Sequence, residues 1–249
     1  MQEKQLAFFA LHGFLGEGAD WIQFKDELRK VLPSFDFYAP SLFSHSNTFN
    51  FESFETISES IQNYLQTMSF NNQSIKKVYI GYSLGGRIGL HLLNSGLFDH
   101  FIFISTHPGL SQVEDQQKRI EADKIWADRV KQLDWDDFLG QWSSQDVLAK
   151  SVKIKRQEVH FDRNKLRQAL LNLSLGQQDN KESIIQKHQN QITWVVGDKD
   201  QKFLDLGNEL VEKKILPNIG RISNSGHRVV FDQPSQLAKY ISDLLFQIN

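Results

Sequence analysis

Short apolar runs alternate along the chain with longer stretches in which apolar residues recur every three or four positions. Short apolar runs are typical of buried strands, and the longer period is typical of amphipathic helices. The candidate strands are Leu6–Leu11, Phe35–Ala39, Lys77–Gly81, Phe101–Ser105, Ile192–Gly197 and, more weakly, Gly220–Ser223. The candidate helices are Trp21–Leu32, Phe54–Thr67, Leu84–Asn94, Phe203–Lys213 and Ser235–Phe246. This alternation predicts an α/β fold, with a mostly parallel sheet that helices flank on both faces. The polar run at 71–74 predicts a loop.

The stretch from His107 to about Gln189 interrupts the alternation. It is polar and helical in pattern, for example at Gln116–Leu133 and Arg163–Leu173, and it contains no convincing strand. An inserted all-helical segment between two strands is expected to cover the active-site edge of the sheet. We therefore predict a core formed by residues 1–106 and 190–249, and a helical lid formed by residues 107–189.

Composition narrows the function class. A chain of 249 residues is long enough for one sizeable domain with a buried core. The net charge of -2 gives no indication of a nucleic-acid surface, and the absence of cysteine excludes disulfides and thiolate metal sites. No apolar stretch is long enough to cross a bilayer, and Leu6–Leu11 is too short for a signal peptide. We expect a cytoplasmic protein without a metal or other cofactor, whose oligomeric state the sequence does not indicate.

The strongest candidate chemistry lies at Gly81–Gly85, which reads G-x-S-x-G. An apolar run, Val78–Ile80, precedes it and a helical pattern, Arg87–Leu93, follows. This is the context of a nucleophile elbow, in which a serine stands on a tight turn between a strand and a helix. Glycine suits such a turn because the two backbones approach closely. The pattern predicts that Ser83 is a catalytic serine.

A serine hydroxyl needs an imidazole to accept its proton and a carboxylate to orient that imidazole. In this fold the order along the chain is serine, acid, histidine. The candidate acids, Asp198 and Asp200, follow the strand at Ile192–Gly197, and His227 precedes the last helix. We prefer Asp200 because it lies in the loop beyond the strand end, and Asp198 is the alternative.

An oxyanion intermediate also needs hydrogen-bond donors. The backbone N–H of Leu84, directly after the candidate nucleophile, is expected to supply one. The second is expected from Phe14, in the glycine-containing turn that follows His12-Gly13 and the first strand. The glycines of this turn fit neither the dinucleotide-binding nor the P-loop pattern.

Several segments together resemble the menaquinone-pathway enzyme family MenH, the 2-succinyl-6-hydroxy-2,4-cyclohexadiene-1-carboxylate synthases of the α/β-hydrolase superfamily. The similar segments are Leu11–Gly16 with Asp20-Trp21, Gly81–Arg87, His107–Leu110 with Arg119, Asp123 and Trp126, Gly197–Phe203, and Ser225–His227. The most specific parts are the arginine after the elbow and the acid loop ending in Lys-Phe. The resemblance implies an α/β-hydrolase fold and a lyase that removes pyruvate from 2-succinyl-5-enolpyruvyl-6-hydroxy-3-cyclohexene-1-carboxylate. It also implies that Ser83, assisted by His227, abstracts a ring proton.

The implied substrate is a small polycarboxylate, so its binding needs local cations. Arg87, one turn into the helix after Ser83, is a candidate, although a solvated helix position is the alternative. Arginine offers a planar fork that matches a carboxylate. The resemblance adds Arg119 and, with a shift of the alignment, Arg156. Tyr82 and Trp142 are expected to form pocket walls, and for Trp142 packing between lid helices is an equal alternative.

Two segments depart from the family pattern. Pro40–Ser46 lacks the Asp-x-Pro-Gly-His-Gly usual after the second strand, and Arg228–Pro234 is less polar than usual. Two other functions also stay open. One is a serine hydrolase that acts on a small carboxylate-bearing ester, and the other is a non-catalytic binding protein. The presence of all three triad residues argues against the second.

Overall fold

The computed structural model describes residues 5–32, 34–67 and 75–247. The loop predicted at 71–74 lies outside these residues. Within these residues the sheet has six strands in the order β2-β1-β3-β4-β5-β6, and all the neighbouring strands are parallel. The strands are β1 (Gln5–Leu11), β2 (Phe35–Tyr38), β3 (Ile75–Tyr82), β4 (His100–Ile104), β5 (Ile192–Gly197) and β6 (Gly220–Ile222). The prediction of a parallel α/β sheet is confirmed.

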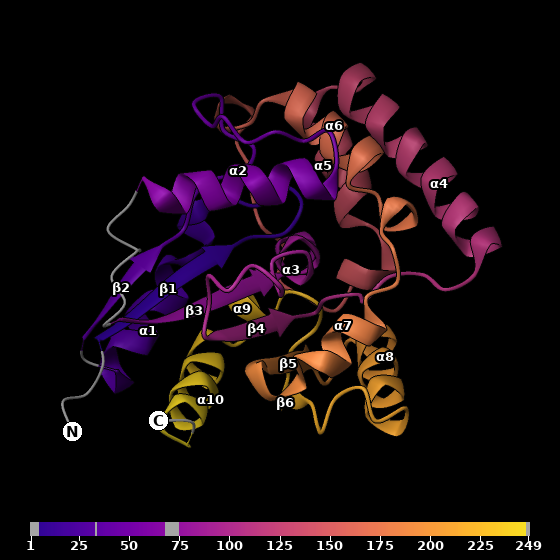
Figure 1. Cartoon of the computed structure of the whole chain (residues 1–249). Coiled ribbons are helices and arrows are strands. Elements are labelled where there is room, and N and C mark those ends of the chain that lie inside the picture. Colours follow the sequence, from indigo (N-terminus) through magenta and orange to yellow (C-terminus); the bar gives the residue numbers. More distant parts are fainter. Residues whose placement is uncertain (1–4, 33, 68–74, 248–249) are drawn as a thin grey trace.

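Helices cover both faces of this sheet, because alternate residues of each buried strand point to opposite sides. In β1, Phe8 packs with helix α1 (Ile22–Val31) and helix α10 (Pro234–Gln247), whereas Phe9 packs on the other face. That second face is covered by α2 (Phe54–Gln66), α3 (Leu84–Leu90) and α8 (Gln201–Glu212). In Figure 1, α1 and α10 lie on the opposite side of the sheet from α2. The short helix α9 (Val229–Asp232) precedes α10.

The predicted helix after the elbow is longer than the observed one. The apolar pattern predicts a helix as far as Asn94, but α3 ends at Leu90. The N–H groups of His91 and Leu92 bond to Ile88 and Gly89 in tighter three-residue turns. Leu92 and Leu93 are buried although they lie beyond the helix, so the apolar pattern continues where the helix does not.

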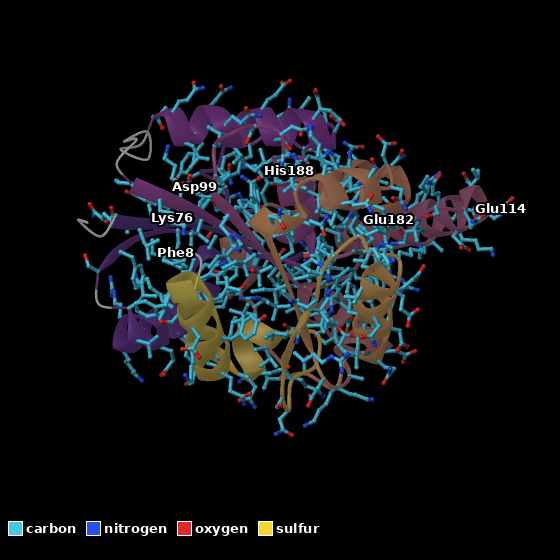
Figure 2. The ribbon with its side chains drawn as sticks, turned by 60° about the horizontal axis from the view of Figure 1, so that its bottom comes forward. Phe8, Lys76, Asp99, Glu114, Glu182 and His188 are labelled. Carbon is cyan, nitrogen blue, oxygen red and sulfur yellow. The ribbon has the colours of Figure 1, made fainter. Side chains whose placement is uncertain are left out.

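The segment between β4 and β5 is helical, as predicted. Its helices are α4 (Val113–Gln132), α5 (Trp135–Ser143), α6 (Arg163–Asn172) and α7 (Glu182–Lys187), with short 3-10 segments at Asp146–Leu148, Glu158–His160 and Leu175–Gln177. The largely polar α4 buries little besides Asp123, Ala127 and Val130. Glu114, in its first turn, projects at the outer edge of the molecule in Figure 2.

The last helix of this segment contacts the part of the chain that carries the sheet. Glu182 of α7 pairs with Lys213, directly after α8, and His188 Nε2 lies 2.9 Å from Asn94 Oδ1. The division into a core and a lid at residues 107 and 189 therefore stays a prediction. Helices α4, α5 and α6 lie together at the upper right of Figure 1.

Candidate active site

Ser83 stands at the junction of β3 and α3, at the carboxyl edge of the sheet. Its backbone is left-handed (φ 51°, ψ -110°), a conformation that costs about 1–3 kcal/mol in a non-glycine residue. The Ser83 N–H donates to Ile104 O of β4 at 2.9 Å, which fixes the turn. A Cβ at Gly81 would lie 2.6 Å from Gly86 Cα, and one at Gly85 would overlap the Leu11 carbonyl oxygen. The glycines of the motif are therefore required by the close approach of strand, helix and β1.

The three residues predicted as a triad lie within hydrogen-bond distance of one another. His227 Nδ1 is 2.7 Å from Asp200 Oδ2, and His227 Nε2 is 3.2 Å from Ser83 Oγ. Because a carboxylate only accepts, Nδ1 carries the proton of the neutral ring and Nε2 is left to accept from the serine hydroxyl. The alternative acid, Asp198, accepts instead from the Ser225 N–H. The geometry therefore favours Asp200 over Asp198.

Two aromatic rings hold the imidazole in place. The ring centroid of Phe203, in the first turn of α8, lies 4.6 Å from that of His227, and the ring centroid of Tyr82 lies 5.6 Å from it. His227 and Asp200 are both buried. This packing restricts the ring to the orientation in which Nε2 faces Ser83.

The two predicted oxyanion donors lie at the same edge of the sheet. Leu84 is the first residue of α3, so its N–H has no partner inside the helix. Phe14 lies within the turn that the hydrogen bond from the Gly16 N–H to Gly13 O closes. Within the described ranges neither N–H is bonded to a protein acceptor. Both residues line the same cavity as Ser83.

The atypical loop at Pro40–Ser46 is held by His12. The His12 Nδ1 lies 2.8 Å from Gly13 O, and the Leu42 N–H donates to Nε2 at 2.9 Å. Since Nε2 accepts, Nδ1 donates and the ring is neutral. Burial lowers the pKa of His12 to about 4, in agreement with this tautomer. The Ser41 hydroxyl accepts from the Gly18 N–H, so the loop without the glycine pair is still fastened to the turn after β1.

A cavity of about 810 Å³ opens at this edge, between the sheet and the inserted helices. Arg87 lines it, one turn after Ser83. Its guanidinium donates to Leu173 O at 2.8 Å and lies over the Phe54 ring at 5.5 Å. Among the described residues no carboxylate forms an ion pair with it, and burial lowers the pKa of Arg87 to about 9. A carboxylate that entered the cavity next to Arg87 would relieve this cost of burying a charge.

The other two predicted arginines also line the cavity, but each has a protein partner. Arg119 Nε donates to Asp123 Oδ2 at 2.8 Å. Arg156 donates through both terminal nitrogens to Asp20, at 2.6 Å each, and lies 3.4 Å from Glu17. The Arg156 guanidinium, which the sequence analysis expected to bind a substrate carboxylate, is therefore bound to Asp20. The roles of Arg119 and Arg156 in substrate binding stay predictions.

The two residues predicted to form pocket walls, Trp142 and Tyr82, are aromatic residues that line the cavity. Trp142 of α5 lines the cavity, and its ring lies 4.5 Å from Phe14 and 5.0 Å from Trp126 of α4. Trp142 therefore fits both expectations, a pocket wall and packing between inserted helices. Tyr82 lines the cavity as well and is almost fully buried.

Sequence reasoning gave no role to two further residues of the cavity, Lys202 and His107. Both belong to the segments that resemble MenH, and both lie within a few residues of the carboxyl end of a strand, at the edge where sites in parallel sheets are found. That position was the signal available for them. Among the residues that the structure describes, no group of three or more His, Cys, Asp or Glu side chains is placed to hold a metal ion.

Residues 8–240 match the alpha/beta hydrolase family. The chain belongs to this family. It is 27% identical over 245 residues to the 2-succinyl-6-hydroxy-2,4-cyclohexadiene-1-carboxylate synthase of Enterobacter sp. (strain 638), covering 94% of this chain and 90% of that protein. It is 26% identical to the putative enzyme of the same name from Bacillus subtilis (strain 168), covering 97% and 91%. The resemblance to MenH is thereby confirmed.

Solved structures agree on the fold. MenH from S. aureus superposes with a TM-score of 0.82 at 20% identity, covering 99% of this chain and 95% of that one. A malate-bound thermophilic esterase from Thermogutta terrifontis superposes with a TM-score of 0.68 at 15% identity, covering 98% and 91%. At these identities the likeness shows the fold alone. No helix within the described ranges has the length and apolar character that crossing a membrane requires.

Proposed function

We propose that this protein is a 2-succinyl-6-hydroxy-2,4-cyclohexadiene-1-carboxylate synthase, a lyase that eliminates pyruvate from 2-succinyl-5-enolpyruvyl-6-hydroxy-3-cyclohexene-1-carboxylate. The observation that supports it most directly is the buried guanidinium of Arg87, which lies in the cavity beside Ser83 without a carboxylate partner among the described residues. A hydrolase for neutral esters has no need of such a group. The named relatives, each matched over most of its length, support the same synthase activity.

The first step is removal of a proton from the ring carbon that bears the succinyl group. Ser83 Oγ, whose own proton passes to His227 Nε2, takes this proton as the C–H bond breaks. The electron pair moves onto the succinyl carbonyl oxygen. In the proposed pose the N–H groups of Phe14 and Leu84 donate to this oxyanion, which lowers the barrier. Asp200 keeps His227 in the accepting tautomer and stabilises the imidazolium.

The second step returns the electron pair through the ring. The carbonyl re-forms, a double bond forms at the deprotonated carbon, the ring double bond shifts, and the C–O bond to the enolpyruvyl group breaks. Enolpyruvate leaves with that electron pair, takes up a proton and converts to pyruvate. The remaining ring holds two conjugated double bonds, as the product requires. No covalent bond to Ser83 is formed, and this separates the lyase from an esterase.

The direct test is pyruvate release, coupled to lactate dehydrogenase. We expect Ser83→Ala to lower kcat by roughly 10²–10⁴-fold, the contribution of a positioned base. The matched control is Ser144→Ala, since Ser144 lines the same cavity outside the triad. Arg87→Met is expected mainly to raise KM. Wild-type pyruvate release no faster than that of Ser83→Ala would refute the proposal.

The competing function, hydrolysis of a small carboxylate-bearing ester, requires an acyl-enzyme on Ser83. It predicts a burst with an activated ester such as a p-nitrophenyl ester, followed by steady turnover of that ester. A burst without pyruvate formation would favour the hydrolase. Labelling of Ser83 by a fluorophosphonate does not separate the two, because either enzyme has an activated serine.

A further inference from the structure

Lys202 lies in the first turn of α8, two residues after Asp200, and lines the cavity. The residue is exposed to solvent at the mouth of this edge of the sheet. Within the described part of the chain its amine has neither a hydrogen bond nor an ion pair. Partial burial and, next, the positive charge of Arg119 lower the pKa of Lys202, and the charge of Asp200 acts in the opposite direction. The ring of Phe203, the residue after Lys202, lies 6.4 Å from the ring of His107, so the first turn of α8 adjoins His107. The amine is thus a cation in the cavity whose charge the protein leaves without a direct partner.

His107 follows β4 and lines the same cavity. The Gly109 N–H donates to His107 Nδ1 at 3.1 Å, so Nδ1 is an acceptor and the proton of the neutral ring is on Nε2. Burial and the cations Lys202, Arg87 and Arg119 lower the pKa of His107 to about 3, which keeps the ring neutral. The Nε2–H is therefore a donor without a protein acceptor among the described residues.

The surroundings of these two groups select an anion. Asp123, the carboxylate nearest to Arg119, is already bonded to Arg119 and to the Ser174 hydroxyl. The cavity as a whole has more cations than carboxylates, although the chain is net negative. Its cations are Arg87, Arg119, Lys150, Arg156, Lys199, Lys202 and Arg228, and its carboxylates are Asp20, Asp123, Asp146 and Asp200.

We propose that Lys202 and His107 bind one carboxylate of the substrate, and that together with Arg119 they form a subsite that supplements Arg87. The Lys202 ammonium and the His107 Nε2–H each donate to a carboxylate oxygen, and charge-assisted hydrogen bonds of this kind are the stronger ones. The inference rests on the proposed function for the identity of the substrate. The subsite fits a carboxylate of that substrate, and succinate, which has the carboxylate of the succinyl arm, serves as the probe.

The decisive variants remove one donor at a time. Lys202→Met removes the ammonium, and Lys202→Arg keeps a cation. The matched control is Lys118→Met, at an exposed lysine of α4 that pairs with Asp115. His107→Asn keeps an acceptor near the Nδ1 position for the Gly109 N–H but loses the Nε2–H donor. His107→Gln keeps a donor near the Nε2 position but loses the acceptor for the Gly109 N–H. Pyruvate release gives kcat and KM, and isothermal titration calorimetry gives the dissociation constant of succinate.

We expect Lys202→Met and His107→Asn each to raise KM and the succinate dissociation constant by about tenfold, the value of one charge-assisted hydrogen bond, with a much smaller change in kcat. Lys202→Arg and His107→Gln should recover most of the affinity, and Lys118→Met should match the wild type. Unchanged KM in both loss variants, or a fall in kcat alone, would overturn the subsite.

If the wild type releases no pyruvate, the proposed function fails, and the affinity for succinate then tests the carboxylate subsite on its own. Weaker binding in both variants keeps the carboxylate subsite, and equal or undetectable binding in the wild type and both variants rejects it.

Discussion

The tautomer of His227 depends on which of the two carboxylates after β5 contacts its ring. Asp200 contacts the ring at Nδ1, whereas Asp198 accepts from the Ser225 backbone and stays away from it. In Asp200→Asn the amide can donate to Nδ1, which favours the tautomer with its proton on Nε2. The Ser83 hydroxyl then has no acceptor. We expect kcat/KM for pyruvate release to fall by about 10⁴-fold, the size of effect known for this change in a serine triad.

Asp198→Asn is the matched control, because it lies two residues away in the same loop. Its amide oxygen can still accept from the Ser225 N–H, so we expect kcat/KM within a few-fold of the wild type. A loss as large as that of Asp200→Asn would mean that the acid has been assigned to the wrong residue.

For single residues, the sequence predicted where a side chain lies in the fold better than which group it contacts. The triad order and the strand ends restricted the candidates to a few residues, and the structure brings Ser83, Asp200 and His227 together. Arg156 shows the limit. Its residue type and its place in the inserted segment suited a carboxylate, but its fork faces Asp20, which is distant along the chain. Which groups meet across 136 positions depends on how the inserted segment packs, and local spacing does not encode that.

Among the elements, the contact between the inserted segment and the loop after β1 depends on a buried ion pair. Arg156 and Asp20 are about 90% buried, and Arg156 also lies over the Phe231 ring at 5.9 Å. Removing one partner leaves the other charge buried. We expect Asp20→Asn or Arg156→Met alone to lower the free energy of unfolding by about 3–5 kcal/mol, and the double variant to lose clearly less than the sum. Urea denaturation monitored by tryptophan fluorescence measures the free energy of unfolding of the single variants and of the double variant.

An exposed pair supplies the comparison. Lys239 and Asp243 pair on α10 with more than half of each side chain exposed. Lys239→Gln is therefore expected to change the free energy of unfolding by less than about 1 kcal/mol. Strictly additive losses for Asp20 and Arg156 would show that the two side chains do not stabilise each other, and that the inserted segment is held by its aromatic contacts instead.

The elements themselves were largely predictable, because burial on both faces gives strands continuous apolar runs. Helix ends were less so, as α3 shows, since Leu92 and Leu93 extend the apolar pattern into a turn. The loop at Pro40–Ser46 was open for a related reason. Its conformation depends on a hydrogen bond from the Leu42 N–H to His12, thirty residues earlier. The absence of the usual glycines indicates only that this loop has a different conformation, and it does not indicate which one.

For the whole molecule, burial of neutral histidines predicts how stability depends on pH. Burial lowers the pKa of His12 and His100 to about 4, and that of His91 and His107 to about 3, from 6.5. Between these values the unfolded chain binds protons that the folded chain does not, so stability rises with pH. We expect the free energy of unfolding to be highest above pH 6.5 and to fall as the pH decreases toward 4. Urea denaturation at a series of pH values measures this.

His100→Gln isolates one of the four contributions. The side chain is buried at the start of β4, with Nε2 2.8 Å from Thr193 Oγ1. Because the replacement cannot titrate, the slope of unfolding free energy against pH near pH 5 should become shallower by about 1 kcal/mol per pH unit. Thr193→Val removes the hydrogen bond but keeps the titrating ring, so it should lower stability at every pH and leave most of the slope. An unchanged slope in His100→Gln would mean that the ring already binds a proton in the folded protein. Burial alone would then not account for the acid sensitivity of this fold.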